Sequence, residues 1–96
     1  MANLRELKKD ISYLVLELIS DCFMYSDFHP GEKTDELSAL VSEAVDLRND
    51  LIARVNNPLN RDDPKAVRAH YQAIKKDLIT GIDTLFGKLS ALSGKE

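Results

Sequence analysis

The chain has 96 residues and a formal net charge of −3, so it provides no overall basic field that would attract nucleic acid or anionic lipid. This length is sufficient for one modest hydrophobic core without disulfides or metals, and we therefore expect a single domain over residues 1–96. The single cysteine, Cys22, excludes an internal disulfide and is typical of a reducing compartment.

The first predicted helix covers residues 4–26, with Asn3 as its N-cap and His29-Pro30-Gly31 beyond its end. Its expected core stripe has the three-and-four spacing of an amphipathic helix. The stripe consists of Leu4, Leu7, Ile11, Leu14, Leu18, Cys22 and Tyr25. Asp21 borders this stripe, and we expect it to be a structural polar residue.

A second apolar strip on the same helix consists of Leu16, Ile19 and Phe23. It lies about 100° around the helix from the first stripe. A three-helix bundle of this size can leave part of such a broad apolar surface exposed, and an exposed apolar patch usually marks an interface. We expect these three residues to form a self-association or partner surface. Burial against a neighbouring helix is the alternative.

The second predicted helix covers residues 35–56 and follows a capping hydroxyl on Thr34. A charged residue, Arg48, lies at the centre of its apolar stripe. A guanidinium in a core requires an acidic partner, because its desolvation is costly. We predict that Arg48 reaches across the bundle to Asp10 and packs its stem against Tyr71, which makes all three structural polar residues. The alternative is that Arg48 binds a ligand carboxylate or phosphate.

The third predicted helix covers residues 64–92, and the pair Asp63-Pro64 is a strong helix-start signal. Gly81 lies on its core side, where a glycine permits the close approach of a bulky neighbour. We expect Phe23 or Tyr25 to be that neighbour, with a small-molecule pocket over the glycine as the alternative. Short connections between three long helices predict an all-α fold, an antiparallel up-down-up three-helix bundle.

His70 borders the stripe of the third helix. A histidine on a helical bundle resembles phosphotransfer domains, which are small, helical and free of cofactors. That resemblance covers one residue and a fold class, and it implies a phosphoryl-accepting role for His70. Those domains follow the histidine with a lysine and a glycine within about one turn, whereas this chain has Ala73 and Ile74 there. A histidine at the edge of the core is the simpler interpretation.

No metal site, cofactor or catalytic residue is expected from the sequence. The two histidines, His29 and His70, lie in different segments, and Cys22 has no second thiol for zinc. The sequence shows no glycine-rich phosphate loop, nucleophile elbow or zincin pattern. Basic residues gather around the third segment, and a solvated face explains them better than a nucleic-acid groove. They are Arg61, Lys65, Arg68, Lys75 and Lys76.

Acidic residues at Glu6, Asp10 and Glu17 interrupt the start of the sequence, so we expect no secretory signal peptide. No apolar run approaches the length that a bilayer requires. These features favour a cytoplasmic protein without a membrane partner.

The sequence therefore favours a non-enzymatic protein–protein interaction module. We expect it to associate with itself through the first helix, as a homodimer or larger oligomer, or with another protein. The alternative is an anion- or metabolite-binding, or phosphoryl-accepting, helical module centred on Arg48 or His70.

Overall fold

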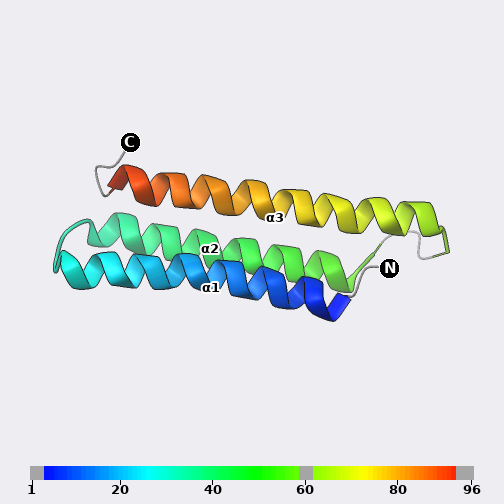
Figure 1. Cartoon of the computed structure of the whole chain (residues 1–96), viewed down its shortest axis with the longest axis horizontal. Helices are drawn as coiled ribbons and strands as arrows, with labels where there is room; N and C mark the ends of the chain where they lie inside the picture. Colours follow the sequence, from blue (N-terminus) through cyan, green and yellow to red (C-terminus); the bar gives the residue numbers. More distant parts are fainter. Residues whose placement is uncertain (1–3, 59–61, 93–96) are drawn as a thin grey trace.

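In the computed structural model, which describes residues 4–58 and 62–92, three long helices run antiparallel to one another (Figure 1). The helices are α1 (Leu4–Phe28), α2 (Thr34–Asn56) and α3 (Pro64–Leu92), and the described residues contain no strand. The bundle measures 52 × 22 × 19 Å. Of the three helices α3 is the longest, with 29 residues and about 44 Å of rise. The prediction of an all-α, up-down-up three-helix bundle is confirmed.

The helix ends follow the local sequence, with one correction. Backbone N–H groups of Lys65 and Ala66 donate to Oδ1 of Asp63 at 3.0 and 3.4 Å, as expected of an N-cap. Thr34, the predicted cap of α2, is instead its first helical residue. The preceding Lys33 has φ 56° in the left-handed region, and it leads the chain into the helix without a side-chain cap. Asn3, the predicted cap of α1, lies outside the described residues.

The start of α2 is reached through a compact turn after α1. The N–H of His29 donates to the carbonyl of Tyr25 at 2.9 Å, so helical bonding continues past the predicted end at position 26. Gly31 then adopts φ 78°, which glycine reaches without a Cβ clash. The N–H of Glu32 donates to the carbonyl of His29 at 3.0 Å and closes the turn.

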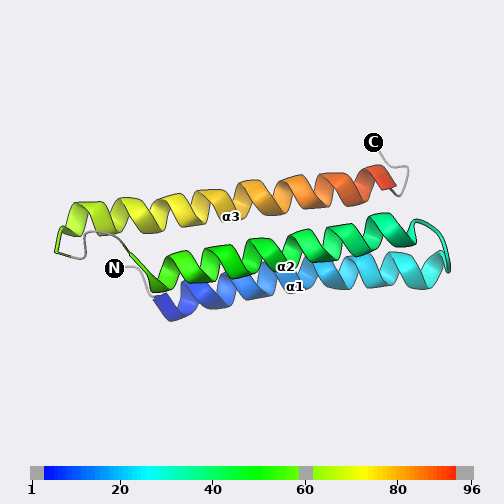
Figure 2. The same cartoon turned by 180° about the vertical axis from the view of Figure 1, so that it is seen from behind.

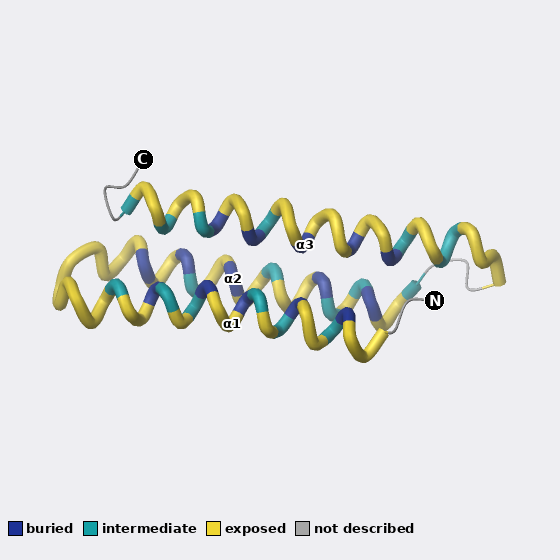
Figure 3. The backbone as a smooth tube through the Cα atoms, in the orientation of Figure 1, coloured by how far each residue is buried: buried dark blue, intermediate teal, exposed yellow. Residues whose placement is uncertain are grey.

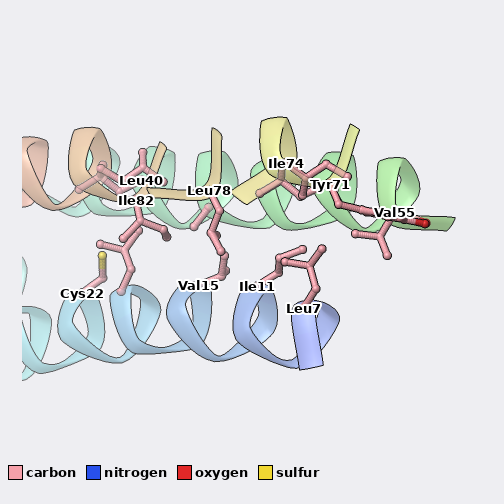
Figure 4. Packing of buried hydrophobic residues seen from close by; sticks show 14 of the residues in the cluster. Leu7, Ile11, Val15, Cys22, Leu40, Val55, Tyr71, Ile74, Leu78 and Ile82 are labelled. Carbon is pink, nitrogen blue, oxygen red and sulfur yellow. The ribbon is translucent and has the colours of Figure 1, made fainter. Parts of the chain in front are cut away.

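One continuous apolar core runs along the bundle axis (Figure 3). Figure 4 shows the buried side chains of α1 pointing toward those of α2 and α3. Among the described residues, no polar or charged residue is buried. The buried residues are Leu7, Ile11, Val15, Leu18, Cys22, Leu37, Leu40, Ala44, Leu51, Val55, Tyr71, Ile74, Leu78, Ile82 and Leu85. Relative to the predicted stripe of α1, Val15 is buried, Leu14 is half-buried and Leu4 is exposed.

Gly81 provides a close approach between α2 and α3. A Cβ at this position would lie 2.9 Å from Cδ2 of Leu47 and 3.0 Å from its Cδ1. The prediction of a bulky neighbour was right in kind, but the neighbour is Leu47 rather than Phe23 or Tyr25. The reason is the register of α3, whose first turns extend beyond the end of α2 (Figures 1 and 2). Gly81 therefore lies opposite the middle of α2.

Replacing Gly81 with alanine tests this contact. Alanine gains about 1 kcal/mol of helix propensity over glycine, but at position 81 it must displace Leu47. We expect Gly81→Ala to stabilise the wild type less than it stabilises a Leu47→Ala background, where the gain should be about 1 kcal/mol. Urea melts of the four proteins measure the coupling.

Gly87 supplies the matched control, because it lies in the same helix and has nothing within 4 Å of an added Cβ. Gly87→Ala should stabilise both backgrounds by about 1 kcal/mol. Equal stabilisation of the wild type by Gly81→Ala and Gly87→Ala would contradict the close approach.

Candidate interaction surface

The outer side of α1 carries most of the exposed apolar surface. Of the eight large apolar side chains that are exposed among the described residues, six lie on α1. Four of them, Tyr13 (66% exposed), Leu16 (59%), Phe23 (61%) and Met24 (56%), form what we call the outer patch. They lie away from the buried stripe that ends at Cys22, so folding of the bundle leaves them in water.

The predicted strip of Leu16, Ile19 and Phe23 is divided by the fold. Leu16 and Phe23 are exposed, whereas Ile19 is half-buried and packs against the core. Position 19 lies closer to the buried stripe around the helix, at about 100° per residue, than positions 16 and 23 do. The exposed surface accordingly extends around α1 in the other direction, to Tyr13 and Met24, which the predicted strip did not include.

Shallow grooves border the outer patch on both sides. The groove between α1 and α2 has a volume of about 420 Å³, with Phe23 on one wall. Its polar groups include the hydroxyls of Ser26, Thr34, Ser38 and Ser42. The groove between α1 and α3 has a volume of about 510 Å³ and is bordered by Tyr13, Leu14 and Ile79, with one acid, Asp10, and one base, Lys75. Both grooves are open to solvent, and apolar atoms make up most of their surfaces.

Arg48 does not occupy the core, and the predicted pair with Asp10 is wrong. Both residues are exposed, and the Nη1 of Arg48 donates to Oδ1 of the adjacent Asn49 at 3.2 Å. The long arginine stem lets the guanidinium reach water from a position near the apolar stripe, which avoids the cost of burying a charge. Leu47, one position earlier, contacts α3 at Gly81 instead.

Arg54 joins α2 to α3, and this contact was not predicted from the sequence. Its Nη1 donates to Oδ2 of Asp77 at 2.8 Å, and Oδ2 of Asp50 lies 3.9 Å away. A second ion pair between the same helices joins Nζ of Lys88 to Oε1 of Glu43 at 2.9 Å. In the sequence, Glu43 and Arg54 are eleven positions apart, as are Asp77 and Lys88. On antiparallel helices, this equal spacing lets both ion pairs form in one register. It was the signal in the sequence from which the two pairs could have been predicted.

His70 and Tyr71 bind the end of α2. The ring Nε2 of His70 lies 2.6 Å from the carbonyl oxygen of Arg54, so this nitrogen carries the proton and donates it. The buried Tyr71 donates its hydroxyl to the carbonyl of Val55 at 3.4 Å. The last carbonyls of a helix lack partners within the helix, and these two side chains satisfy two of them. Arg48 lies six residues before Arg54, about 9 Å of helix rise away. The two ligand candidates, Arg48 and His70, are therefore at different levels of the bundle.

Cys22 is enclosed in the core and has little thiolate character. Its exposure is 1%, and it forms no disulfide. Burial raises the pKa of the Cys22 thiol, and the negative charge of Asp21 raises it further. Asp21 itself is half-buried beside the core. A thiol that stays protonated in an apolar environment is a poor nucleophile and a poor metal ligand.

Within residues 4–58 and 62–92, no three histidine, cysteine, aspartate or glutamate residues are grouped so as to hold a metal ion. In the same ranges no helix is both long and apolar enough to span a bilayer. The basic residues Lys65, Arg68, Lys75 and Lys76 are all exposed, and Arg61 lies outside the described residues.

Comparison with models of protein families, with curated proteins and with solved structures gives no match for this chain. The residues themselves are therefore the basis for any statement about function.

Thiol labelling tests the assignment of Cys22 to the core. We expect a thiol reagent at mildly alkaline pH to modify native Cys22 only as fast as the bundle opens, and to modify it rapidly in denaturant. Ser26→Cys in a Cys22→Ser background is the matched control, because Ser26 is exposed one turn further along α1. That thiol should react rapidly in the native protein. Equally rapid native labelling of Cys22 would show that the face of α1 is misassigned.

Two double-mutant cycles test the arginine assignments. Arg54 is 31% and Asp77 52% exposed, so we expect a coupling of about 0.5–1 kcal/mol between Arg54→Met and Asp77→Ala. The cycle of Arg48→Met with Asp10→Ala should give a coupling near zero. Denaturant melts supply both values. A large coupling between Arg48 and Asp10 would restore the predicted cross-bundle pair.

Proposed function

We propose that this chain is a non-enzymatic protein-interaction module that associates with a second copy of itself through the outer patch on α1. The observation that carries the proposal is the concentration of exposed large apolar side chains on one helix, six of eight among the described residues. Scattered single apolar residues are normal on protein surfaces, whereas a gathering of exposed apolar side chains on one side of a helix favours an interface.

The size of the outer patch indicates how strong the association would be. Tyr13, Leu16, Phe23 and Met24 are each more than half exposed, and side chains of this size present on the order of 100 Å² each in that state. Two copies would thus bury roughly 800 Å² of apolar side-chain surface, below the total of about 1,200–2,000 Å² typical of stable complexes. We therefore expect a weak dimer that forms at high protein concentration.

The polar groups support an interaction role rather than chemistry. His70, Arg54 and Lys88 are each bonded between helices, and the raised pKa of Cys22 keeps its thiol protonated. Of the two ligand candidates named from the sequence, His70 bonds to the carbonyl of Arg54, whereas Arg48 is exposed and bonds to the adjacent Asn49. A lone reduced cysteine in the core also fits the cytoplasm, where we place the protein.

Phe23→Glu tests the proposal by sedimentation equilibrium. The side chain is exposed in the folded bundle, so the variant should fold with unchanged helicity. A charge in the patch should oppose association, because it would have to be desolvated at the interface. We expect the wild-type mass to rise above 10.8 kDa with concentration, and the variant to remain at the monomer mass.

Val45→Glu is the control, because Val45 is 40% exposed, lies on α2 and lines neither groove beside the outer patch. It removes an exposed apolar side chain, adds the same charge and should leave association intact. If only Val45→Glu abolishes association, the surface lies on α2 rather than on α1. A wild type that remains monomeric at millimolar concentration would contradict self-association altogether.

A further inference from the structure

We propose that the second copy binds with its α1 antiparallel to the first, around a twofold axis at the level of residue 18. This arrangement rests on the proposed self-association and specifies its geometry. α1 lies along one edge of the bundle in both views (Figures 1 and 2), so its outer side faces away from α2 and α3.

A regular seam runs along that outer side. Its residues alternate spacings of four and three, the pattern by which one helix meets a single partner helix. The seam residues are Lys9, Tyr13, Leu16, Ser20, Phe23 and Asp27. The apolar and charged members of the seam are all exposed. The buried stripe of the same helix follows its own three-and-four pattern on the opposite side. α1 therefore has two seams, and the bundle uses only one of them.

The outer seam is complementary to the same seam of a second copy that runs in the opposite direction. In an antiparallel pair centred on position 18, Tyr13 of each copy meets Phe23 of the other, and two aromatic contacts form. Leu16 meets Ser20, and the small serine side chain gives the leucine room. At each end, a cation faces an anion, because position 9 of one copy meets position 27 of the other. A twofold interface requires this kind of self-complementarity, because one surface must serve as both halves.

The charges select the antiparallel orientation. In a parallel pair, Lys9 would face Lys9 and Asp27 would face Asp27, and both contacts would be repulsive. Among the described residues, neither Lys9 nor Asp27 has an ion-pair partner within its own chain, so both are available. Glu17 lies on the flank of the seam close to the axis, where it approaches Glu17 of the second copy, and this keeps the association weak.

Charge reversal tests the arrangement. In Lys9→Asp, both end contacts become acid against acid, and in Asp27→Lys they become base against base. We expect each single variant to dimerise about tenfold more weakly than the wild type. The double variant Lys9→Asp/Asp27→Lys exchanges the charges and should recover wild-type association. Sedimentation equilibrium supplies the dissociation constants.

Mixing the two single variants gives the sharpest result. In a mixed pair, the aspartate introduced at position 9 of one copy faces the lysine introduced at position 27 of the other. At the opposite end, the unchanged Asp27 and Lys9 meet as in the wild type, so both end contacts are attractive. A 1:1 mixture should therefore form heterodimers although neither variant dimerises well alone.

Folding of these variants is checked by circular dichroism melts. The substitutions place an acid in the first half of α1 and a base near its end, as the helix dipole favours. Both positions are exposed, so we expect helicity to be retained. Loss of association in a variant that melts like the wild type is then an effect on the interface.

Asp46→Lys and Lys76→Asp are controls, because they make the same charge changes at exposed positions on α2 and α3. Both should associate as the wild type does. If the wild type dimerises but the seam variants behave like these controls, self-association stands and the antiparallel seam is overturned. If Lys9→Asp binds the wild type more tightly than the wild type binds itself, the helices are parallel and the arrangement is wrong. If the wild type does not dimerise, the proposed function fails as well.

Discussion

A three-helix bundle can cover only the inner side of each helix, and this constraint governs the molecule. Each helix touches two neighbours, so an arc of its circumference always faces water. In α2 and α3 that arc is mainly polar or charged. In α1 it carries Tyr13, Leu16, Phe23 and Met24, because apolar residues on this helix extend well beyond its buried stripe. The fold is complete without these side chains, and an interface would give them a role.

The contacts between α2 and α3 fix the register of the bundle. Leu47 fits over Gly81, and the ion pairs Arg54–Asp77 and Glu43–Lys88 hold the same alignment. His70 and Tyr71 then take up carbonyl groups at the end of α2, which explains why the first turns of α3 extend beyond that end. Of the two ligand candidates named from the sequence, His70 is engaged in this alignment, whereas Arg48 is not. The outer patch of α1 has no comparable structural role.

Helical periodicity and the cap at Asp63 are local signals, so the fold class and most of the core could be predicted from the sequence. The position of the Arg48 side chain could not be predicted in this way. A helical wheel gives the direction of a Cβ, but it does not show whether a long side chain stays near the axis or extends to water. The expected neighbours of Gly81, Phe23 and Tyr25, were wrong for a different reason, the register of α3. The true register of α3 was encoded in the equal spacing of two charge pairs, which only a comparison of α2 with α3 reveals.

The candidate surface was predicted only in part, because a helical wheel again gives directions and not neighbours. Leu16 and Phe23 were recognised as surplus apolar residues, but a strip defined by angle alone cannot show where a neighbouring helix stops covering it, and Ile19 packs against the core.

Intermolecular paramagnetic relaxation tests most directly whether α1 meets α1 of a second copy. A spin label on Phe28→Cys in a Cys22→Ser background lies at an exposed position at the end of α1, outside the seam. The spin-labelled protein, at natural isotope abundance, is mixed at high concentration with ¹⁵N-labelled wild type that carries no spin label. Antiparallel pairing predicts selective broadening of wild-type amides near Lys8 and Lys9. Broadening near Phe28 instead, on α2 or α3 only, or nowhere would contradict the antiparallel contact between the two copies of α1.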